Sequence, residues 1–133
     1  MSRCFADTYY FLALINPKDA AHERAVQFTE GYAGDFVTTQ FVLIEVANAL
    51  SAPAFRERAV MLVESLTGRT EVTVIGASEA WFERGMELYR SRGDKGWSLA
   101  DCISFVVMQE RGIQDALTAD HHFEQAGFVA LLK

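Results

Sequence analysis

Four acidic residues lie at positions where an isolated negative charge needs an explanation. Asp7 directly follows an apolar run, and Asp120 comes two residues after another. Glu45 is surrounded by apolar neighbours, and Asp101 stands three residues after Ser98. If these side chains meet, they form an all-oxygen ligand set, which suits Mg²⁺ or Mn²⁺ better than zinc.

The chemistry of such a cluster follows from electrostatic repulsion. Two carboxylates about 4 Å apart repel by roughly 4 kcal/mol at an effective dielectric constant near 20. A divalent cation offsets this repulsion. The bound ion can polarise a phosphodiester, bind the leaving oxygen and lower the pKa of an attacking water. The four acids therefore predict metal-dependent nuclease chemistry.

Each acid also has a structural alternative. Asp7 and Asp120 both precede a predicted helix, and Asp is favoured as a helix N-cap. Ser98 and Asp101 resemble a capping box, although Glu or Gln is the usual second partner. A cap and a functional role are compatible at a helix start beside the sheet edge.

Glu45 is harder to explain structurally, because a buried carboxylate without a partner is costly. The sequence offers no basic residue one helical turn away. Asn48 shares the same face and can donate a hydrogen bond but cannot neutralise the charge. A metal ion, or a Lys or Arg from elsewhere in the fold, must compensate it. Asp94 is expected to be a solvated loop charge rather than a supporting acid of this site.

The elements that position these acids are strands alternating with helices. Strands are predicted at residues 4–6, 36–39, 72–75, 116–118 and 128–131, and helices at 8–14, 19–29, 41–50, 53–66, 79–89, 98–110 and around Phe123. This order predicts an α/β fold with a mostly parallel sheet of four or five strands and helices on both faces. In such sheets the working site lies beyond the carboxyl ends of the strands, where Asp7 and Asp120 stand.

Composition narrows the class of protein further. The chain has 133 residues, half of them hydrophobic, and shows no repeat or linker, so residues 1–133 are expected to form a single domain. The net charge of −6 disfavours a duplex-DNA binder that relies on phosphate contacts. Two cysteines, Cys4 and Cys102, are too few for a disulfide framework or a zinc site and are expected in the core. No apolar run is long enough for a membrane span, and Asp7 interrupts the only signal-like stretch, so a cytoplasmic protein is expected.

Four sequence blocks resemble the PIN-domain family, and most closely its small bacterial VapC-type toxins of type II toxin–antitoxin systems. The blocks, in order, are FADT at residues 5–8, TT at 38–39 with EVANAL at 45–50, WSLADC at 97–102 and LTADHHF at 117–123. They span essentially the whole chain. No single block is decisive, but four in this order at this length are fairly specific.

The resemblance implies a three-layer α/β/α fold with a central parallel sheet. It also implies that Asp7, Glu45, Asp101 and Asp120 bind one or two Mg²⁺ or Mn²⁺ ions and that the protein cleaves RNA endonucleolytically. The implied partners are a small antitoxin, whose C-terminal segment blocks the site, and a second copy in a homodimer. Thr8 and Thr118 match hydroxyl positions near the acids.

Two other functions compete with an RNA-cleaving toxin. The first is a catalytically inactive PIN-like domain that binds RNA or a protein partner, which the loss of a metal-binding acid would favour. The second is a phosphotransfer domain. A dehalogenase-like phosphatase requires a second Asp two residues after the nucleophile, where this chain has Tyr9.

Surface positions are expected for His22, His121 and His122, with contact to a phosphate as the alternative for His121 and His122, which stand beside Asp120. Trp97 is expected to anchor a loop, although it could also stack on a base. Arg90, Arg92 and Lys95 either guide RNA by charge or form a solvated face. An apolar stripe at helical spacing is expected to pack in the core; it consists of Phe55, Leu62 and Leu66.

Overall fold

A computed structural model describes residues 2–133 and shows a five-stranded, fully parallel sheet. The strand order is β3-β2-β1-β4-β5. The strands are β1 (Arg3–Ala6), β2 (Asp35–Thr39), β3 (Val72–Ile75), β4 (Asp115–Leu117) and β5 (Val129–Ala130). The predicted parallel α/β fold is confirmed.

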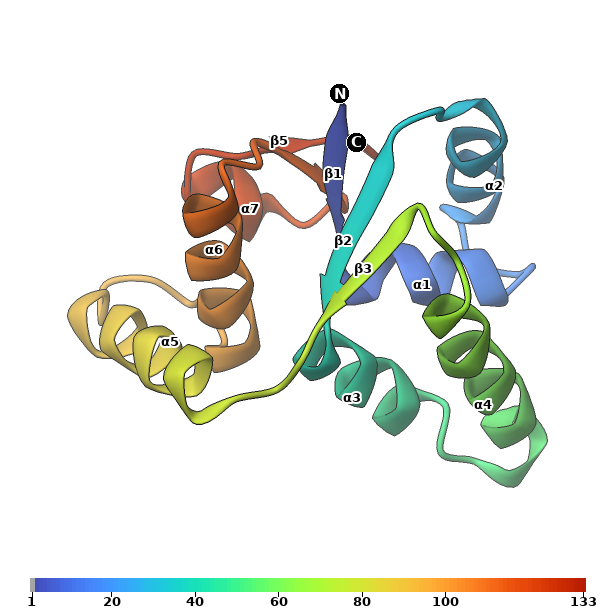
Figure 1. Ribbon diagram of the computed structural model, residues 1–133, viewed down its shortest axis with the longest axis horizontal. Coiled ribbons are helices and arrows are strands. Elements are labelled where there is room, and N and C mark those ends of the chain that lie inside the picture. The colour runs from blue at the N-terminus through green and yellow to red at the C-terminus, as the bar shows by residue number, and fades with distance from the viewer. Residues whose placement is uncertain (1) are drawn as a thin grey trace.

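Helices cover both faces of this sheet (Figure 1). They are α1 (Thr8–Ile15), α2 (His22–Gly31), α3 (Gln40–Ala49), α4 (Pro53–Thr67), α5 (Glu79–Ser91), α6 (Leu99–Arg111) and α7 (His121–Gln125). In Figure 1, α1, α2 and α4 lie on one side of the strands, and α5, α6 and α7 lie on the other. Three layers result, as expected.

The strand order places a switch point at β1. From β1 the chain proceeds to β2 and β3 on one side, and later to β4 and β5 on the other. At such a point the connections leave the carboxyl ends of adjacent strands in opposite directions and open a crevice there. Asp7 follows β1 and Asp120 follows β4, which pairs directly with β1. The topology therefore brings these two acids to the same edge.

The centre of the molecule is built from β1 and α6. Cys4 and Phe5 of β1 are fully buried, and α6 has seven consecutive buried residues, 102–108. Such continuous apolar runs are typical of elements covered on several sides. Gly85 of α5 permits a close approach to α6, because a Cβ atom there would lie 2.3 Å from Ile103 Cγ1 and 3.2 Å from its Cα. The helix that carries Asp101 is thus held on every side.

Two predicted boundaries were wrong. The helix expected at 19–29 begins at His22, because Asn16 and Asp19 accept hydrogen bonds from the backbone two residues ahead and form turns. The strand expected at 128–131 spans Val129–Ala130 only. Within residues 2–133, no helix combines the length and the apolar character needed to cross a membrane.

Candidate active site

Asp7 is the most buried of the four acids and lies between β1 and α1. It occupies the N-cap position of α1, but its side chain makes no capping hydrogen bond. Only 7% of the residue is exposed. Its Oδ2 accepts a hydrogen bond of 3.0 Å from the Thr118 hydroxyl. Asp7 therefore stands at the N-cap position, as the structural alternative expected, but it does not cap α1 through its side chain.

The environment of Asp7 disfavours its charged form. The pKa of the carboxyl is raised from 3.8 to about 7, mainly by burial and in smaller part by the negative charges of Asp101 and Glu45. The Thr118 hydroxyl and the Thr8 backbone N–H act in the opposite direction but are outweighed. A carboxyl group with this pKa is half protonated near neutrality unless a cation joins it.

Glu45 reaches the same edge from α3. Its Oε1 accepts a hydrogen bond of 2.7 Å from the Thr8 hydroxyl. Burial raises its pKa, and the nearby charge of Asp101 raises it further. Asn48, the partner considered from helical spacing, is exposed and makes no side-chain hydrogen bond to Glu45 in the described chain. Thr8 takes that place.

Within residues 2–133, no basic side chain neutralises Asp7 or Glu45. Among residues 2–133, no ion pair involves Asp7 or Glu45. Compensation by a Lys or Arg from elsewhere in the fold, one of the two possibilities for Glu45, is therefore not found in this part of the chain. A bound metal ion is the other possible compensation for the charge of Glu45.

Asp101 caps α6 as its sequence predicted, and its carboxylate also contacts His122. Ser98 Oγ accepts a hydrogen bond of 3.0 Å from the Asp101 amide, and Asp101 Oδ2 accepts one of 3.3 Å from the Ser98 amide, which completes a capping box for α6. The same Oδ2 lies 3.2 Å from His122 Nδ1. Burial raises the pKa of Asp101 and the charge of Asp120 adds to this, whereas the Ser98 amide and His122 lower it.

Asp120 forms the outer end of the cluster. Its Oδ1 accepts a hydrogen bond of 2.9 Å from the His122 amide and caps α7. Its own amide donates 3.1 Å to Thr118 Oγ1. Thr118 thus connects Asp120 with Asp7, because the same hydroxyl donates to Asp7. The N-cap alternative is confirmed for Asp120.

The four acids line one edge, as expected from the strand ends, but they do not form a single tight shell. The charges of Glu45 and Asp101 raise the pKa of Asp7, and the charge of Asp101 also raises that of Glu45. The charge of Asp120 raises the pKa of Asp101. Within residues 2–133, however, the three potential ligands whose atoms all lie within 4.8 Å of one another are Asp120, His121 and His122. The acids form a row rather than a closed cage.

His122 lies deeper in the row of acids than its sequence position predicted. It was expected at the surface, yet it is mostly buried and its Nδ1 lies between Asp101 at 3.2 Å and Asp120 at 3.5 Å. His121 is exposed, as expected. His22 is also half-buried, with its Nδ1 2.8 Å from the Ala13 carbonyl oxygen. The one available signal for His122 was its place two residues after Asp120.

The loop before α6 agrees with its predicted roles. Asp94 is exposed and forms a two-bond ion pair with Arg92, so it is a surface charge. Trp97 is 6% exposed, donates from Nε1 to Gln125 and packs edge-on against Phe105, as expected for a loop anchor.

The row of acids lies at the switch point of the parallel sheet, the place where open α/β sheets bind their ligands. A family model of the PIN domain matches residues 4–129. The chain therefore belongs to the PIN-domain family.

Two individual comparisons make the relationship more specific. The chain is 31% identical to the 23S rRNA-specific endonuclease VapC20 of Mycobacterium tuberculosis, over 94% of this chain and 95% of that protein. The crystal structure of that VapC20, described as a toxin that cleaves the sarcin–ricin loop, superposes with a TM-score of 0.87 at 30% identity, over 96% of this chain and 97% of that one. The resemblance to VapC-type toxins is confirmed.

More distant structures share the fold. A toxin–antitoxin complex from Klebsiella pneumoniae matches with a TM-score of 0.63 at 17% identity, covering 89% of this chain and 87% of that chain. A DNA-bound VapBC from Salmonella typhimurium matches with a TM-score of 0.66 at 15% identity, covering 98% and 96%.

Proposed function

We propose that this protein is a Mg²⁺- or Mn²⁺-dependent endoribonuclease that hydrolyses RNA phosphodiester bonds as the toxin of a type II toxin–antitoxin pair. The observation that carries the proposal is Asp7. It is buried beside Glu45 and Asp101, its pKa is raised to about 7, and it has no basic partner within residues 2–133. The likeness to a ribosomal RNA endonuclease supports RNA as the substrate.

The donor set fits a hard divalent cation. The three inner donors, Asp7, Glu45 and Asp101, are carboxylates, and Asp120 adds a fourth at the rim. A row of carboxylates suits Mg²⁺, which keeps several of its waters and binds few protein ligands. The tighter group of Asp120, His121 and His122 is a weaker candidate, because His121 is exposed and His122 is shared with Asp101.

When bound, the ion supplies charge stabilisation at the phosphate and lowers the pKa of an attacking water. The protein's own groups prepare its place. Thr118 orients Asp7 and Thr8 orients Glu45. His122 holds Asp101, so that the outer acids keep their spacing. Asp7 is half protonated near neutral pH because its pKa is raised to about 7, and a cation held beside it would favour the charged form.

The direct test is cleavage of RNA by the purified protein with added metal. We expect endonucleolytic products in MgCl₂ or MnCl₂, no products in EDTA, and recovery when excess metal is restored. A control without protein, in which RNA is incubated with metal alone, excludes hydrolysis by the ion. Undiminished cleavage in EDTA would show that the acids do not act through a metal.

The relative's substrate suggests which RNA to test first. We propose 23S ribosomal RNA, at the sarcin–ricin loop, because the similar VapC20 is described as cleaving there. Intact ribosomes treated with the protein should yield one primer-extension stop in that loop. Cleavage of transfer or messenger RNA, with 23S RNA left intact, would retain the nuclease but reject this substrate.

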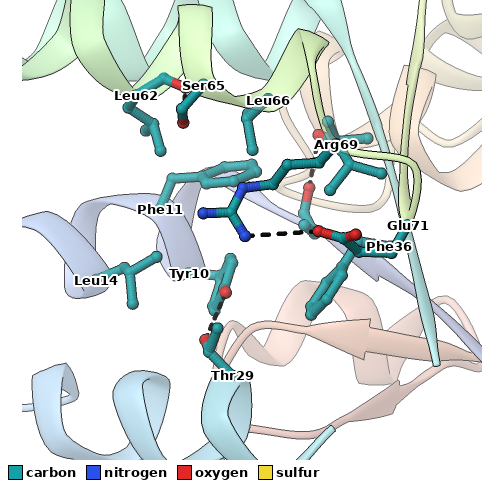
Figure 2. A pocket seen from close by; sticks show the side chains of 13 residues that line it. Tyr10, Phe11, Leu14, Thr29, Phe36, Leu62, Ser65, Leu66, Arg69 and Glu71 are labelled. Atoms are coloured by element: carbon teal, nitrogen blue, oxygen red, sulfur yellow. Dashed lines mark hydrogen bonds and ion pairs between the residues drawn. The ribbon is translucent and has the colours of Figure 1, made fainter. Parts of the chain in front are cut away.

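An antitoxin is the proposed protein partner, because several structures of the same fold are toxin–antitoxin complexes. A cavity of about 100 Å³ lies between α1, α2 and α4, and none of the four acids lines it. Figure 2 shows it between Phe11, Leu14 and Leu62, with Arg69 extending across it to Glu71. An apolar antitoxin side chain fits this lining. A short reading frame beside the gene, whose product co-purifies with the toxin and stops cleavage, would identify the partner.

A homodimer is the remaining proposed assembly. Large apolar side chains are exposed on neighbouring helices: Ile44 on α3, and Phe55, Val60 and Met61 on α4. The expected core position of Phe55 was wrong, although Leu66 of the same stripe is buried. Light scattering after size exclusion should give twice the monomer mass, and Met61→Glu should reduce it. A monomeric wild-type protein would exclude the homodimer.

A further inference from the structure

A surface groove adjoins the row of acids where α5 ends and α6 begins. It has a volume of about 350 Å³ and is lined by Tyr89 of α5, by the loop residues Arg92, Lys95, Gly96 and Trp97, and by Cys102 of α6. None of the four acids lines it. The groove is therefore separate from the acid row and needs its own explanation.

Gly96 connects the groove with the acids. A Cβ atom at Gly96 would lie 4.0 Å from His122 Nε2, and the other ring nitrogen of His122 lies 3.2 Å from Asp101. Cys102 also follows Asp101 directly in α6. The groove therefore adjoins the acid row at His122 and Asp101.

The groove carries a lysine that forms no ion pair in the part of the chain that the structure describes. Residues 90–96 contain three basic residues and one acid, in a protein of net charge −6. Asp94 already pairs with Arg92, whose guanidinium also lies 5.1 Å from the centre of the Trp97 ring. Lys95 forms no ion pair within residues 2–133. Its ammonium group lies close enough to Asp94 to lower the pKa of that carboxyl, but no salt bridge within residues 2–133 occupies it.

The groove also has one aromatic ring available for stacking. Trp97 is not available, because it is 6% exposed and its Nε1 donates to Gln125. Tyr89 is 47% exposed and lies in the last turns of α5. A cation and an exposed aromatic ring in one groove are the two groups that bind single-stranded nucleic acid, one at the phosphate and one at the base.

We propose that this groove binds one nucleotide of the RNA strand next to the cleaved phosphate, with Tyr89 stacked on its base and Lys95 in contact with its phosphate. Arg92, stacked on the Trp97 ring, lines the same groove beside this nucleotide. This assignment rests on the proposed nuclease function and names part of its substrate-binding surface. It also explains how a protein of negative charge holds RNA beside four carboxylates, because the cation lies where the strand leaves them.

The test measures binding and cleavage separately. Binding of a short fluorescein-labelled single-stranded RNA is followed by anisotropy in an Asp7→Asn background, with Mg²⁺ present, at several salt concentrations. Tyr89→Ala should weaken binding about tenfold, whereas Tyr89→Phe, which keeps the ring, should retain it. Lys95→Gln should weaken binding and reduce the slope of log K against log salt by about 0.7, the value for one phosphate contact on a single strand.

Matched controls are available in the chain. Phe82 is an exposed aromatic residue of the same helix, and Lys18 is an exposed lysine in the loop between α1 and α2; neither lines the groove. Phe82→Ala and Lys18→Gln should leave affinity and salt slope unchanged. With the wild-type Asp7 present, the two groove variants should raise KM for RNA several-fold and change kcat little.

The outcomes separate this proposal from the nuclease function. If the wild-type protein cleaves RNA but Tyr89→Ala and Lys95→Gln leave KM, affinity and salt slope as they were, the groove is not a nucleotide site and the nuclease function stands. If the wild-type protein neither cleaves nor binds RNA, both proposals fail together.

Discussion

Asp7 and Asp94 carry the same side chain in opposite surroundings, and the contrast distinguishes a working acid from a surface one. Asp94 is exposed and paired with Arg92, which lowers its pKa. Asp7 is buried near two other acids, and its pKa rises to about 7. An exposed ion pair of this kind contributes little to stability. A buried, unneutralised carboxylate is costly, and a fold that retains one is expected to use it.

The largest expected effect separates these two residues in activity. Asp7→Asn preserves shape and the hydrogen bond from Thr118 but removes a metal-binding charge, so RNA cleavage should fall by about 10³-fold or more. Asp94→Asn makes the same chemical change at the surface and should leave the rate within about twofold. Initial rates at saturating Mg²⁺ test both. Full activity of Asp7→Asn would reject the mechanism.

The second prediction concerns the stability of the metal-free protein against pH. The unfolded chain loses the Asp7 proton near pH 3.8 and the folded protein loses it near pH 7. Between these values the folded state holds a proton that the unfolded state has lost, so stability should fall as pH rises through this window. The raised pKa values of Glu45 and Asp101 act in the same direction.

The size of that effect can be bounded. A rise from 3.8 to about 7 corresponds to at most ~4 kcal/mol between the two limits. Urea unfolding in EDTA from pH 4 to pH 8 should show the decline, and Asp7→Asn should remove most of it. Asp94→Asn should leave the profile unchanged. A metal-free wild-type protein that gains stability over this interval contradicts the raised pKa.

A smaller effect is expected where a hydroxyl supports the buried acid. Thr118→Val removes the donor to Asp7 Oδ2 and the acceptor for the Asp120 amide. Since partners that orient metal ligands are typically worth about 10- to 100-fold, cleavage should fall by that amount and the Mg²⁺ requirement should rise. Thr73→Val, at an exposed position of β3, is the control. Equal effects of the two variants would remove Thr118 from the site.

The smallest difference should separate the adjacent histidines. His122 lies between Asp101 and Asp120, whereas His121 is exposed. His122→Gln should weaken Mg²⁺ activation several-fold, because it loosens the outer acids, and His121→Gln should change it less than twofold. A larger effect at His121 would instead favour the group of Asp120, His121 and His122 as the metal centre.

Local patterns in the sequence predicted most of the fold. The strand at 72–75 has the predicted bounds, and α6 begins after Ser98 and ends at Gly112, whose positive φ of 65° suits glycine. The placement of Asp7 and Asp120 at one edge was predicted from the rule that sites in parallel sheets lie at the carboxyl ends of the strands. These features depend on neighbours in the chain, which a single sequence displays directly.

Features that depend on distant neighbours were predicted less well. Spacing suggested Asn48 as the partner of Glu45, but Thr8 reaches it from another helix. His122 was expected at the surface because the approach of Asp101 cannot be read from adjacent residues. Phe55 was expected in the core because an apolar stripe does not reveal whether this chain or another molecule covers it.

Two of the acids, Asp101 and Asp120, stand at the starts of helices that differ greatly in length and burial. Asp101 belongs to the first turn of α6, whose interior is buried over seven successive residues, whereas Asp120 caps α7, a helix of five residues. Amide hydrogens of α6 should exchange only when the whole protein unfolds, while those of α7 exchange by local fraying. The side of the site at α7 should therefore open locally far more often than the side at α6, a difference that hydrogen exchange would measure.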